Sequence, residues 1–209
     1  MKSISIIPIN NIKVIEKYRA VSLFYKFLFI YLLIAILIFG KGAYIQIKAQ
    51  VAQVLLELAW YQQQQDLLPH KAWSWADGYP LAKISINNQD PLIILSGATG
   101  SNLAFAPSWL AGSSAFNSGG NSVIFAHNDT HFNQLKNIVI GDDISVKSAD
   151  RQIYRYQVSE TKVINELDLS VLALTEEEVI TLITCYPFDS PISNSNLRFV
   201  VIAKRIILI

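Results

Sequence analysis

Residues 179–185 read Val-Ile-Thr-Leu-Ile-Thr-Cys and end at the single cysteine of this 209-residue chain. The run is short and apolar, and Pro187 follows it closely, which favours a β-strand that stops at the cysteine. Cys185 would then leave the core at a rim, where a substrate can reach its thiolate. A lone cysteine is more often a small buried apolar residue, so its surroundings must decide between the two interpretations.

Further short runs of apolar or alternating residues, separated by turn formers, fill the chain after Pro80. They are residues 81–86, 92–95, 122–126, 143–147, 153–164 and 197–207. This spacing predicts a small antiparallel β structure that is closed or nearly closed. One short helix is expected at residues 108–115 and another near Leu135.

His127 also ends an apolar run, residues 123–126, and the polar turn Asn128-Asp129-Thr130 follows it. An imidazole within hydrogen-bond reach of a thiol accepts its proton and later donates one to a leaving amine. For His127 taken alone, a histidine that caps the turn is the structural alternative.

Arg198 lies inside the apolar run 197–202, where a guanidinium is costly to bury without an anionic partner. If it faces the thiol, it would stabilise the negative oxygen that forms when a carbonyl is attacked. The alternative is an ion pair with a surface carboxylate on an edge strand.

A zinc site is a competing hypothesis for the histidine segment. His127 and His131 are four residues apart with Asp129 between them, so a helix there would bring both imidazoles to one metal ion. The turn formers in the segment and the lack of further ligands downstream argue against this hypothesis. We therefore expect no metal and no other cofactor.

The N-terminal part predicts a membrane anchor, because residues 27–40 carry no charge and the apolar character extends to residue 47. Lys2, Lys13, Lys17, Arg19 and Lys26 precede the run against Glu16 alone, whereas Lys41 and Lys48 follow it. The positive-inside rule then predicts a cytoplasmic tail at 1–26, an anchor at 27–47 and export of the rest. A cleaved signal peptide is the alternative, although no clear Ala-x-Ala site follows.

Residues 48–72 form a predicted helical linker, in which apolar residues recur at helical spacing. The helix should fray through the glutamines at 62–65 and stop before Pro69. A folded domain is expected at 73–209, beginning with the aromatic cluster Trp73-Ser74-Trp75 over the edge of a core. The net charge of +1 makes nucleic acid a poor partner.

Three ordered segments resemble the sortase family. Residues 181–185, Thr-Leu-Ile-Thr-Cys, match the family's Thr-Leu-x-Thr-Cys signature, and residues 196–201 are similar to its arginine-bearing strand. Residues 126–132 are similar to the histidine segment of the sortases of Gram-negative bacteria, and residues 73–77 and 185–189 also resemble that subgroup. Asn128 departs from the arginine expected there.

The resemblance implies an all-β fold, a closed eight-stranded β-barrel with short helices behind an N-terminal transmembrane helix. It also implies a cysteine transpeptidase at the inner membrane with a periplasmic catalytic domain. Cys185 would attack the Thr-Gly type bond of an LPxTG-like sorting motif near the C-terminus of an exported protein, and an amine acceptor would resolve the thioacyl-enzyme. His127 would exchange the protons and Arg198 would bind the oxyanion. Thr184 is expected to contact the substrate, and Asp129 to orient an imidazole.

Two alternatives share these residues. One is an anchored cysteine peptidase, in which water resolves the acyl-enzyme. The other is a non-catalytic, membrane-tethered adaptor whose barrel only binds peptides.

Overall fold

The computed structural model describes residues 9–189 and 195–206, with the side chains of residues 9–18, 20, 41 and 43 also outside the description. The start of the predicted tail, residues 1–8, and the end of the last predicted strand, Ile207, thus lie outside the described residues. The chain divides into two compact units, Met1–Gln50 and Val51–Ile209.

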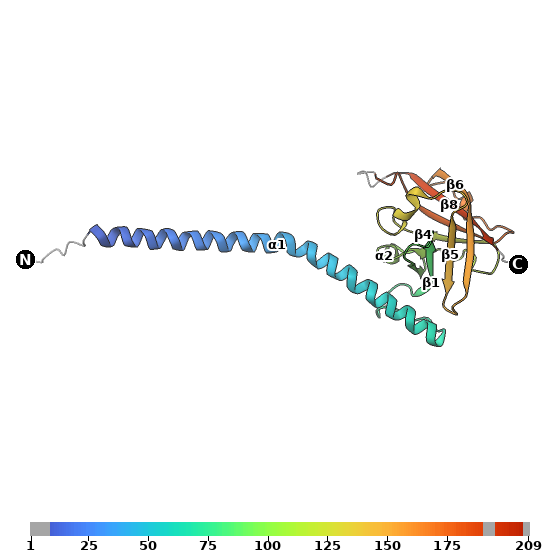
Figure 1. The fold of residues 1–209 in the computed structure, drawn as a ribbon, viewed down its shortest axis with the longest axis horizontal. Helices are drawn as coiled ribbons and strands as arrows, with labels where there is room; N and C mark the ends of the chain where they lie inside the picture. The colour runs from blue at the N-terminus through green and yellow to red at the C-terminus, as the bar shows by residue number, and fades with distance from the viewer. Residues whose placement is uncertain (1–8, 190–194, 207–209) are drawn as a thin grey trace, which may run out of the picture. The chain divides into compact units, whose positions relative to one another are not determined.

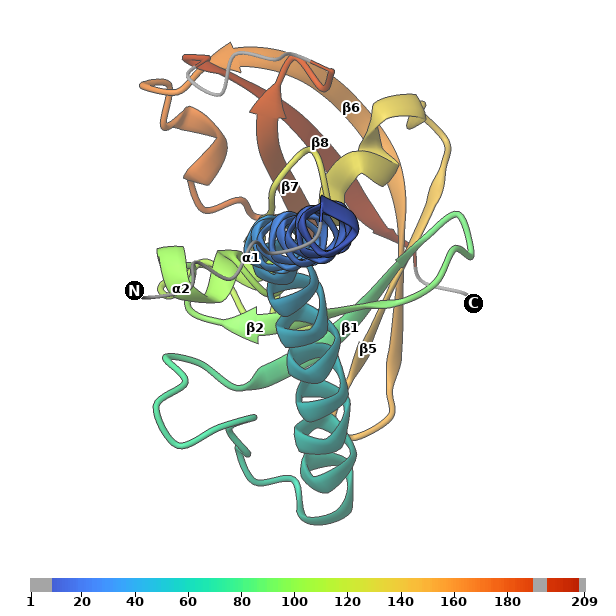
Figure 2. The same cartoon turned by 90° about the vertical axis from the view of Figure 1, so that its left-hand side faces the viewer.

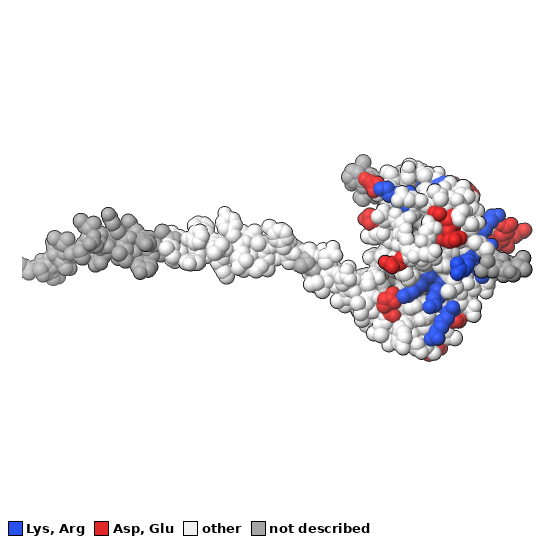
Figure 3. Space-filling view, viewed as in Figure 1, with Lys and Arg blue, Asp and Glu red and all other residues white. Residues whose placement is uncertain are grey.

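Helix α1, Ile9–Asp66, contains a stretch that is long and apolar enough to cross a membrane, Val21–Asp66. The most apolar part of that stretch has no buried residue, and a signal sequence would share these properties. In Figure 3, the described part of α1 that belongs to the first unit is white on the side shown, so no charged side chain is visible there. An anchor is therefore compatible with the helix in length and composition.

The last turns of α1 belong to the second unit, because they pack against its strands. Leu56 and Trp60 form a buried cluster with Ile93 and Leu95, and Trp73 and Phe105 lie at its edge. This packing explains why the predicted fraying at residues 62–65 is wrong: the helix continues to Asp66, with Gln63 buried. The predicted stop before Pro69 and the predicted covering role of Trp73 are confirmed.

Eight strands close into a barrel in the order β1-β2-β3-β4-β7-β8-β6-β5, which confirms the predicted fold (Figures 1 and 2). The strands are β1 Pro80–Ile86, β2 Leu92–Ser96, β3 Ser108–Trp109, β4 Asn121–Phe125, β5 Asp143–Ser148, β6 Ile153–Asn165, β7 Val179–Tyr186 and β8 Leu197–Ile206. The prediction of antiparallel pairing is wrong in two places, since β2 with β3 and β4 with β7 are parallel.

The barrel interior is filled by alternate residues of the strands. Ile124 of β4, Leu182 of β7 and Val201 of β8 belong to one buried cluster that draws on nearly every strand. Because successive strand residues point to opposite faces, their neighbours in sequence lie on the outside of the barrel. Both faces of β7 are covered, which is why its sequence is continuously apolar rather than alternating.

The helix predicted at 108–115 is wrong. Ser108 and Trp109 form β3, which bridges β2 and β4, and turns follow up to Asn121. A two-residue strand is too short to show any periodicity, so its pairing is set by its two neighbours. The helix expected near Leu135 is confirmed as the 3₁₀ segment η1, His131–Asn137. The other short helices are α2, Gly100–Leu103, and η2, Ser170–Leu172.

Charged side chains of both signs lie on the face of the barrel unit shown in Figure 3. That face shows no extended field of one sign, in line with the formal net charge of +1. A nucleic-acid surface would need a clustered basic excess to neutralise phosphates.

Candidate active site

Cys185 and Arg198 lie directly opposite each other on neighbouring strands. The antiparallel register of β7 and β8 pairs Cys185 with Arg198, one step from the pair Thr184 and Phe199. Opposed residues of an antiparallel pair have their Cβ atoms about 4.5–5.5 Å apart. The pairing therefore places the side chains of Cys185 and Arg198 next to each other at their Cβ atoms, although 12 residues lie between them in the sequence.

The parallel pairing of β4 with β7 brings His127 to the same rim. The last pair in the register is Phe125 with Ile183, and the Ala126 amide donates to the Ile183 carbonyl at 3.3 Å. His127 and Cys185 each lie two residues beyond that last pair. Because the strands are parallel, both residues lie at the same end of the sheet.

Contacts beyond the strand ends continue this alignment. The Asn128 side chain donates to the Pro187 carbonyl at 3.0 Å, which joins the residue after His127 to the segment after Cys185. Pro187 also ends β7, as predicted, since the strand stops at Tyr186.

All three candidate catalytic residues belong to the outer face of the barrel. Ile183 and Val200, which are two residues from Cys185 and Arg198, pack in a second cluster outside the barrel, and Val123 of β4 joins them. With a period of two along a strand, Cys185 and Arg198 continue this face, and His127 continues the face of Val123 and Phe125. Cys185 and Arg198 are partly exposed and His127 is exposed, so a substrate can approach them.

Arg198 is held by a carboxylate and by the backbone before β8. Its Nη2 donates to Glu166 Oε2 at 2.5 Å, and its Nη1 donates to the Ser195 and Leu197 carbonyls at 2.7 and 2.9 Å. The ion pair lies near the surface, with side-chain exposures of 26% for Arg198 and 38% for Glu166. The ion pair that the sequence left as the alternative role for Arg198 is therefore present, and the backbone of Arg198 is still paired with Cys185.

Thr184 is buried, with an exposed fraction of 2%, and its hydroxyl donates to the Ala126 carbonyl at 2.7 Å. This bond ties the end of β7 to the end of β4, directly before Cys185 and His127. A direct contact between the Thr184 hydroxyl and a substrate, as predicted, would require the bond to open.

The histidine segment does not form the helix that a shared zinc site needs. Residues 127–130 are irregular, and His131 begins η1. Burial lowers the pKa of His131, and the nearby charge of His127 lowers it further, whereas Asp129 and the Phe105 backbone act in the opposite direction. Asp129 is exposed. Among residues 9–189 and 195–206, no group of three or more His, Cys, Asp or Glu side chains is arranged to hold a metal ion.

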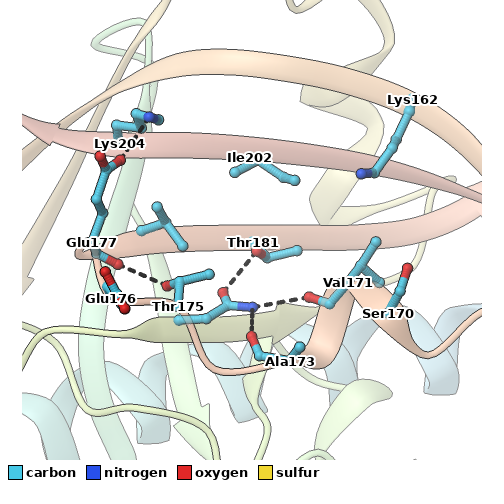
Figure 4. Close-up of a pocket in the computed structure, with 12 residues that line it drawn as sticks. Lys162, Ser170, Val171, Ala173, Thr175, Glu176, Glu177, Thr181, Ile202 and Lys204 are labelled. Carbon is cyan, nitrogen blue, oxygen red and sulfur yellow. Dashed lines mark hydrogen bonds and ion pairs between the residues drawn. The ribbon is translucent and has the colours of Figure 1, made fainter.

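A cavity of about 430 Å³ lies on the same outer face, farther along β7 and β8 from the rim (Figure 4). Thr181 and Ile202 belong to it, and the segment between β6 and β7 forms its other wall. Lys162 of β6 also lines the cavity. It pairs with Val200 of β8, and Val200 is two positions from Arg198.

Two residues beside this site were missed from the sequence, Glu166 and Asn121. The Glu166 carboxylate binds Arg198, and the Asn121 amide lies between β7 and the segment that follows β6. Neither stands out in the chain, because both are common polar residues at strand ends. One signal in the sequence pointed to a residue such as Glu166: a partly buried Arg198 requires an anionic partner.

Known proteins share the sequence pattern and the fold of this chain. Residues 84–206 match the model of the Sortase domain. Sortase D of Bacillus subtilis is 31% identical over 88 residues, which cover 42% of this chain and 43% of that relative. The chain thus spans less than half the length of this curated relative.

Solved sortases share the fold. Sortase A of Listeria monocytogenes is 26% identical with a TM-score of 0.54, covering 60% of this chain and 86% of that one. Sortase C-1 of Actinomyces oris is 27% identical with a TM-score of 0.54, covering 62% and 76%. The Sortase D5 transpeptidase of Clostridium perfringens, at 20% identity, has a TM-score of 0.60 and covers 75% and 99%. The matched residues include Cys185, His127 and Arg198, and the chain belongs to the sortase family.

Proposed function

We propose that this chain is a cysteine transpeptidase in which Cys185, His127 and Arg198 act on one peptide bond. The observation that carries the proposal is the register of three strands. Cys185 pairs with Arg198, and the parallel β4 brings His127 to the same rim and the same face. A buried structural cysteine would need neither partner.

The first half of the reaction forms a thioacyl-enzyme. The Cys185 thiolate forms a C–S bond to the scissile carbonyl carbon, and the carbonyl electrons move to oxygen. When the tetrahedral intermediate collapses, the C–N bond breaks and the His127 imidazolium gives a proton to the departing amine.

The second half returns the enzyme to its starting state. An incoming amine loses a proton to His127 and forms a C–N bond, while the C–S bond breaks and Cys185 leaves as thiolate. One amide is thus exchanged for another, with no net oxidation and no cofactor. The same histidine serves as acid and base because an imidazolium can give up a proton and a neutral imidazole can accept one.

Arg198 supplies the charge that the intermediate requires. Its guanidinium has five N–H donors, and Glu166 and two backbone carbonyls account for three hydrogen bonds. Donors therefore remain for an oxyanion formed at Cys185 or for substrate carbonyls. Loss of an oxyanion donor typically lowers kcat by about 10²–10³.

The substrate we propose is an exported protein with an LPxTG-like motif near its C-terminus, cleaved at the Thr-Gly type bond. This follows from family membership and from the sequence resemblance, as does the amine acceptor.

The long apolar helix α1 supports attachment to the inner membrane through a single span, with the barrel on the periplasmic side. Membership of the Gram-negative subgroup stays a prediction. We propose the same domain limits as in the sequence analysis, 27–47 for the anchor and 73–209 for the catalytic domain.

The test is to incubate the full chain in detergent micelles with a peptide that contains Leu-Pro-Glu-Thr-Gly, with and without triglycine. Mass spectrometry should find the cleaved peptide joined to triglycine, and an acyl adduct on Cys185. The Cys185→Ala variant should give neither product. Cleavage without transfer would support the anchored peptidase instead, and binding without an adduct would support the adaptor.

A further inference from the structure

The connection from β6 to β7, residues 166–178, lies along the outer face that carries the candidate catalytic residues. Its η2 residues Val171 and Leu172 pack with Ile183, two positions before Cys185, and with Val200. Glu166, at its start, holds Arg198. Most of the connection is exposed, and Val171 is its only buried residue among those described. Apolar burial therefore fixes it mainly at one point.

Asn121 supplies a second point of attachment. Its side chain is buried, with an exposed fraction of 3%, and its Nδ2 donates to the Val171 carbonyl at 2.9 Å and to the Ala173 carbonyl at 3.1 Å. Its Oδ1 accepts from the buried Thr181 hydroxyl at 2.7 Å. Figure 4 shows these bonds as dashed lines that run to Val171, Ala173 and Thr181.

We propose that Asn121 is a positioning residue that holds the connection 166–178 in the shape that receives substrate. Thr181 fixes the amide so that both N–H groups face the connection. The proposal rests on the proposed function for its substrate. Its physical basis is independent, because the buried Val171 carbonyl and the less buried Ala173 carbonyl lose their donor when the amide is lost, which is costly for the buried one. Both carbonyls lie on the connection, whereas the amide oxygen is bonded to Thr181 of β7.

Loss of the Asn121 hydrogen bonds should weaken substrate binding and leave the chemical step nearly unchanged. Asn121 begins β4, whereas His127 follows the end of that strand, so its amide does not reach the reacting atoms. A connection that opens more often lowers the population of the binding-competent shape. KM should then rise by about the same factor as that population falls, while kcat stays nearly unchanged.

The sharpest variant is Asn121→Asp. It keeps the shape and an acceptor for Thr181, but it replaces both donors with an oxygen that repels the two carbonyls. Asn102→Asp is a matched control, because Asn102 is also buried and its Nδ2 donates to two carbonyls, those of Ser96 and Gly97. Those carbonyls lie at the end of β2 and not on the connection.

Hydrogen–deuterium exchange of the full chain in micelles tests the attachment without any substrate. Amides of residues 168–177 should exchange about tenfold faster in Asn121→Asp, and those of β7 and β8 should not change. The control should leave 168–177 as in the wild type. With the Leu-Pro-Glu-Thr-Gly peptide, KM should rise about fivefold or more and kcat should change less than about twofold.

Unchanged exchange at 168–177 in Asn121→Asp would overturn the proposal, and so would an equal rise in exchange across the barrel. If that variant does not fold, Thr181→Val takes its place, with hydrogen exchange and KM as the measurements. It removes the hydrogen bond from Thr181 that orients the Asn121 amide and keeps the size of the side chain. A wild type that does not cleave the peptide refutes the proposed function, whereas the exchange result still decides the attachment.

Discussion

In the proposed mechanism Arg198 serves two negative groups, the Glu166 carboxylate and an oxygen that becomes negative only during the reaction. The ion pair is partly exposed, so water weakens the attraction, and the bond is worth more for the direction it gives the guanidinium than for stability. Glu166 follows β6 and is fixed by its own amide, which donates to the Asn196 carbonyl at 2.7 Å. Its carboxylate therefore has a defined place from which to orient Arg198.

Removing the Glu166 side chain should lower activity through Arg198. We expect Glu166→Ala to reduce kcat about tenfold, since the guanidinium loses one of its fixed contacts, with a smaller effect on KM. Glu166→Gln keeps an acceptor oxygen and should restore most of the loss. Steady-state kinetics with the Leu-Pro-Glu-Thr-Gly peptide measures both effects.

The matched control is Glu57→Ala, which breaks an ion pair of similar exposure, Glu57 with Lys83 at 2.6 Å, on α1 and β1. It should leave kcat unchanged. If Glu166→Ala were as active as the wild type, the carboxylate would have no part in orienting Arg198.

His131 should make stability depend on pH in the mildly acidic range. Its folded pKa lies below the unfolded value of about 6.5, so the unfolded chain binds more protons between the two values. The free energy of unfolding should fall as pH drops below 6.5 and level off below the folded pKa, by at most about 1.4 kcal/mol per pH unit. Urea unfolding between pH 7.5 and 5 should show this slope, and His131→Gln should reduce it. An identical slope in the variant would assign the effect to other groups.

At the scale of elements, the last turns of α1 act as part of the barrel unit rather than as a free linker. Trp60 is 4% exposed within the cluster that includes Ile93 and Leu95, whereas its neighbour Tyr61 is 60% exposed. Trp60→Ala should therefore lower the free energy of unfolding of the barrel by about 3–5 kcal/mol, and Tyr61→Ala by less than about 0.5 kcal/mol. Denaturant unfolding measures both. Equal stability of the two variants would mean that the helix end does not support the fold.

The strands show what local sequence can and cannot predict. Seven of the eight follow runs that are visible as apolar or alternating residues, because each must cover part of one core. β3 was missed since two residues have no period, and the parallel pairing of β4 with β7 was missed because pairing is set by the closed barrel. Cys185, His127 and Arg198 could be predicted as candidates, because they end or interrupt apolar runs. Asn121 and Glu166 could not, since their roles depend on neighbours that only the fold provides.

For the whole molecule, the barrel and the long apolar helix suit the proposed enzyme, which would be held at a membrane and act on exported chains. Substrates with an LPxTG-like motif followed by an apolar segment would be held at the same surface. When the enzyme and its substrate are tethered to one membrane, their effective concentration rises. A modest affinity of the enzyme for the motif would then be sufficient.

The single cysteine allows the orientation of the whole molecule to be tested. With the barrel exported, a membrane-impermeant maleimide should label the partly exposed Cys185 in cells with a permeabilised outer membrane and an intact inner membrane. In a Ser3→Cys, Cys185→Ala chain, the label should attach only after the inner membrane is lysed, because the basic tail is expected in the cytoplasm. Cys185→Ala alone should stay unlabelled. The intact mass should also retain the N-terminal residues of the 23.4 kDa chain, since an anchor is not removed as a signal peptide is. Labelling of Cys185 only after lysis would place the barrel in the cytoplasm and rule out exported substrates.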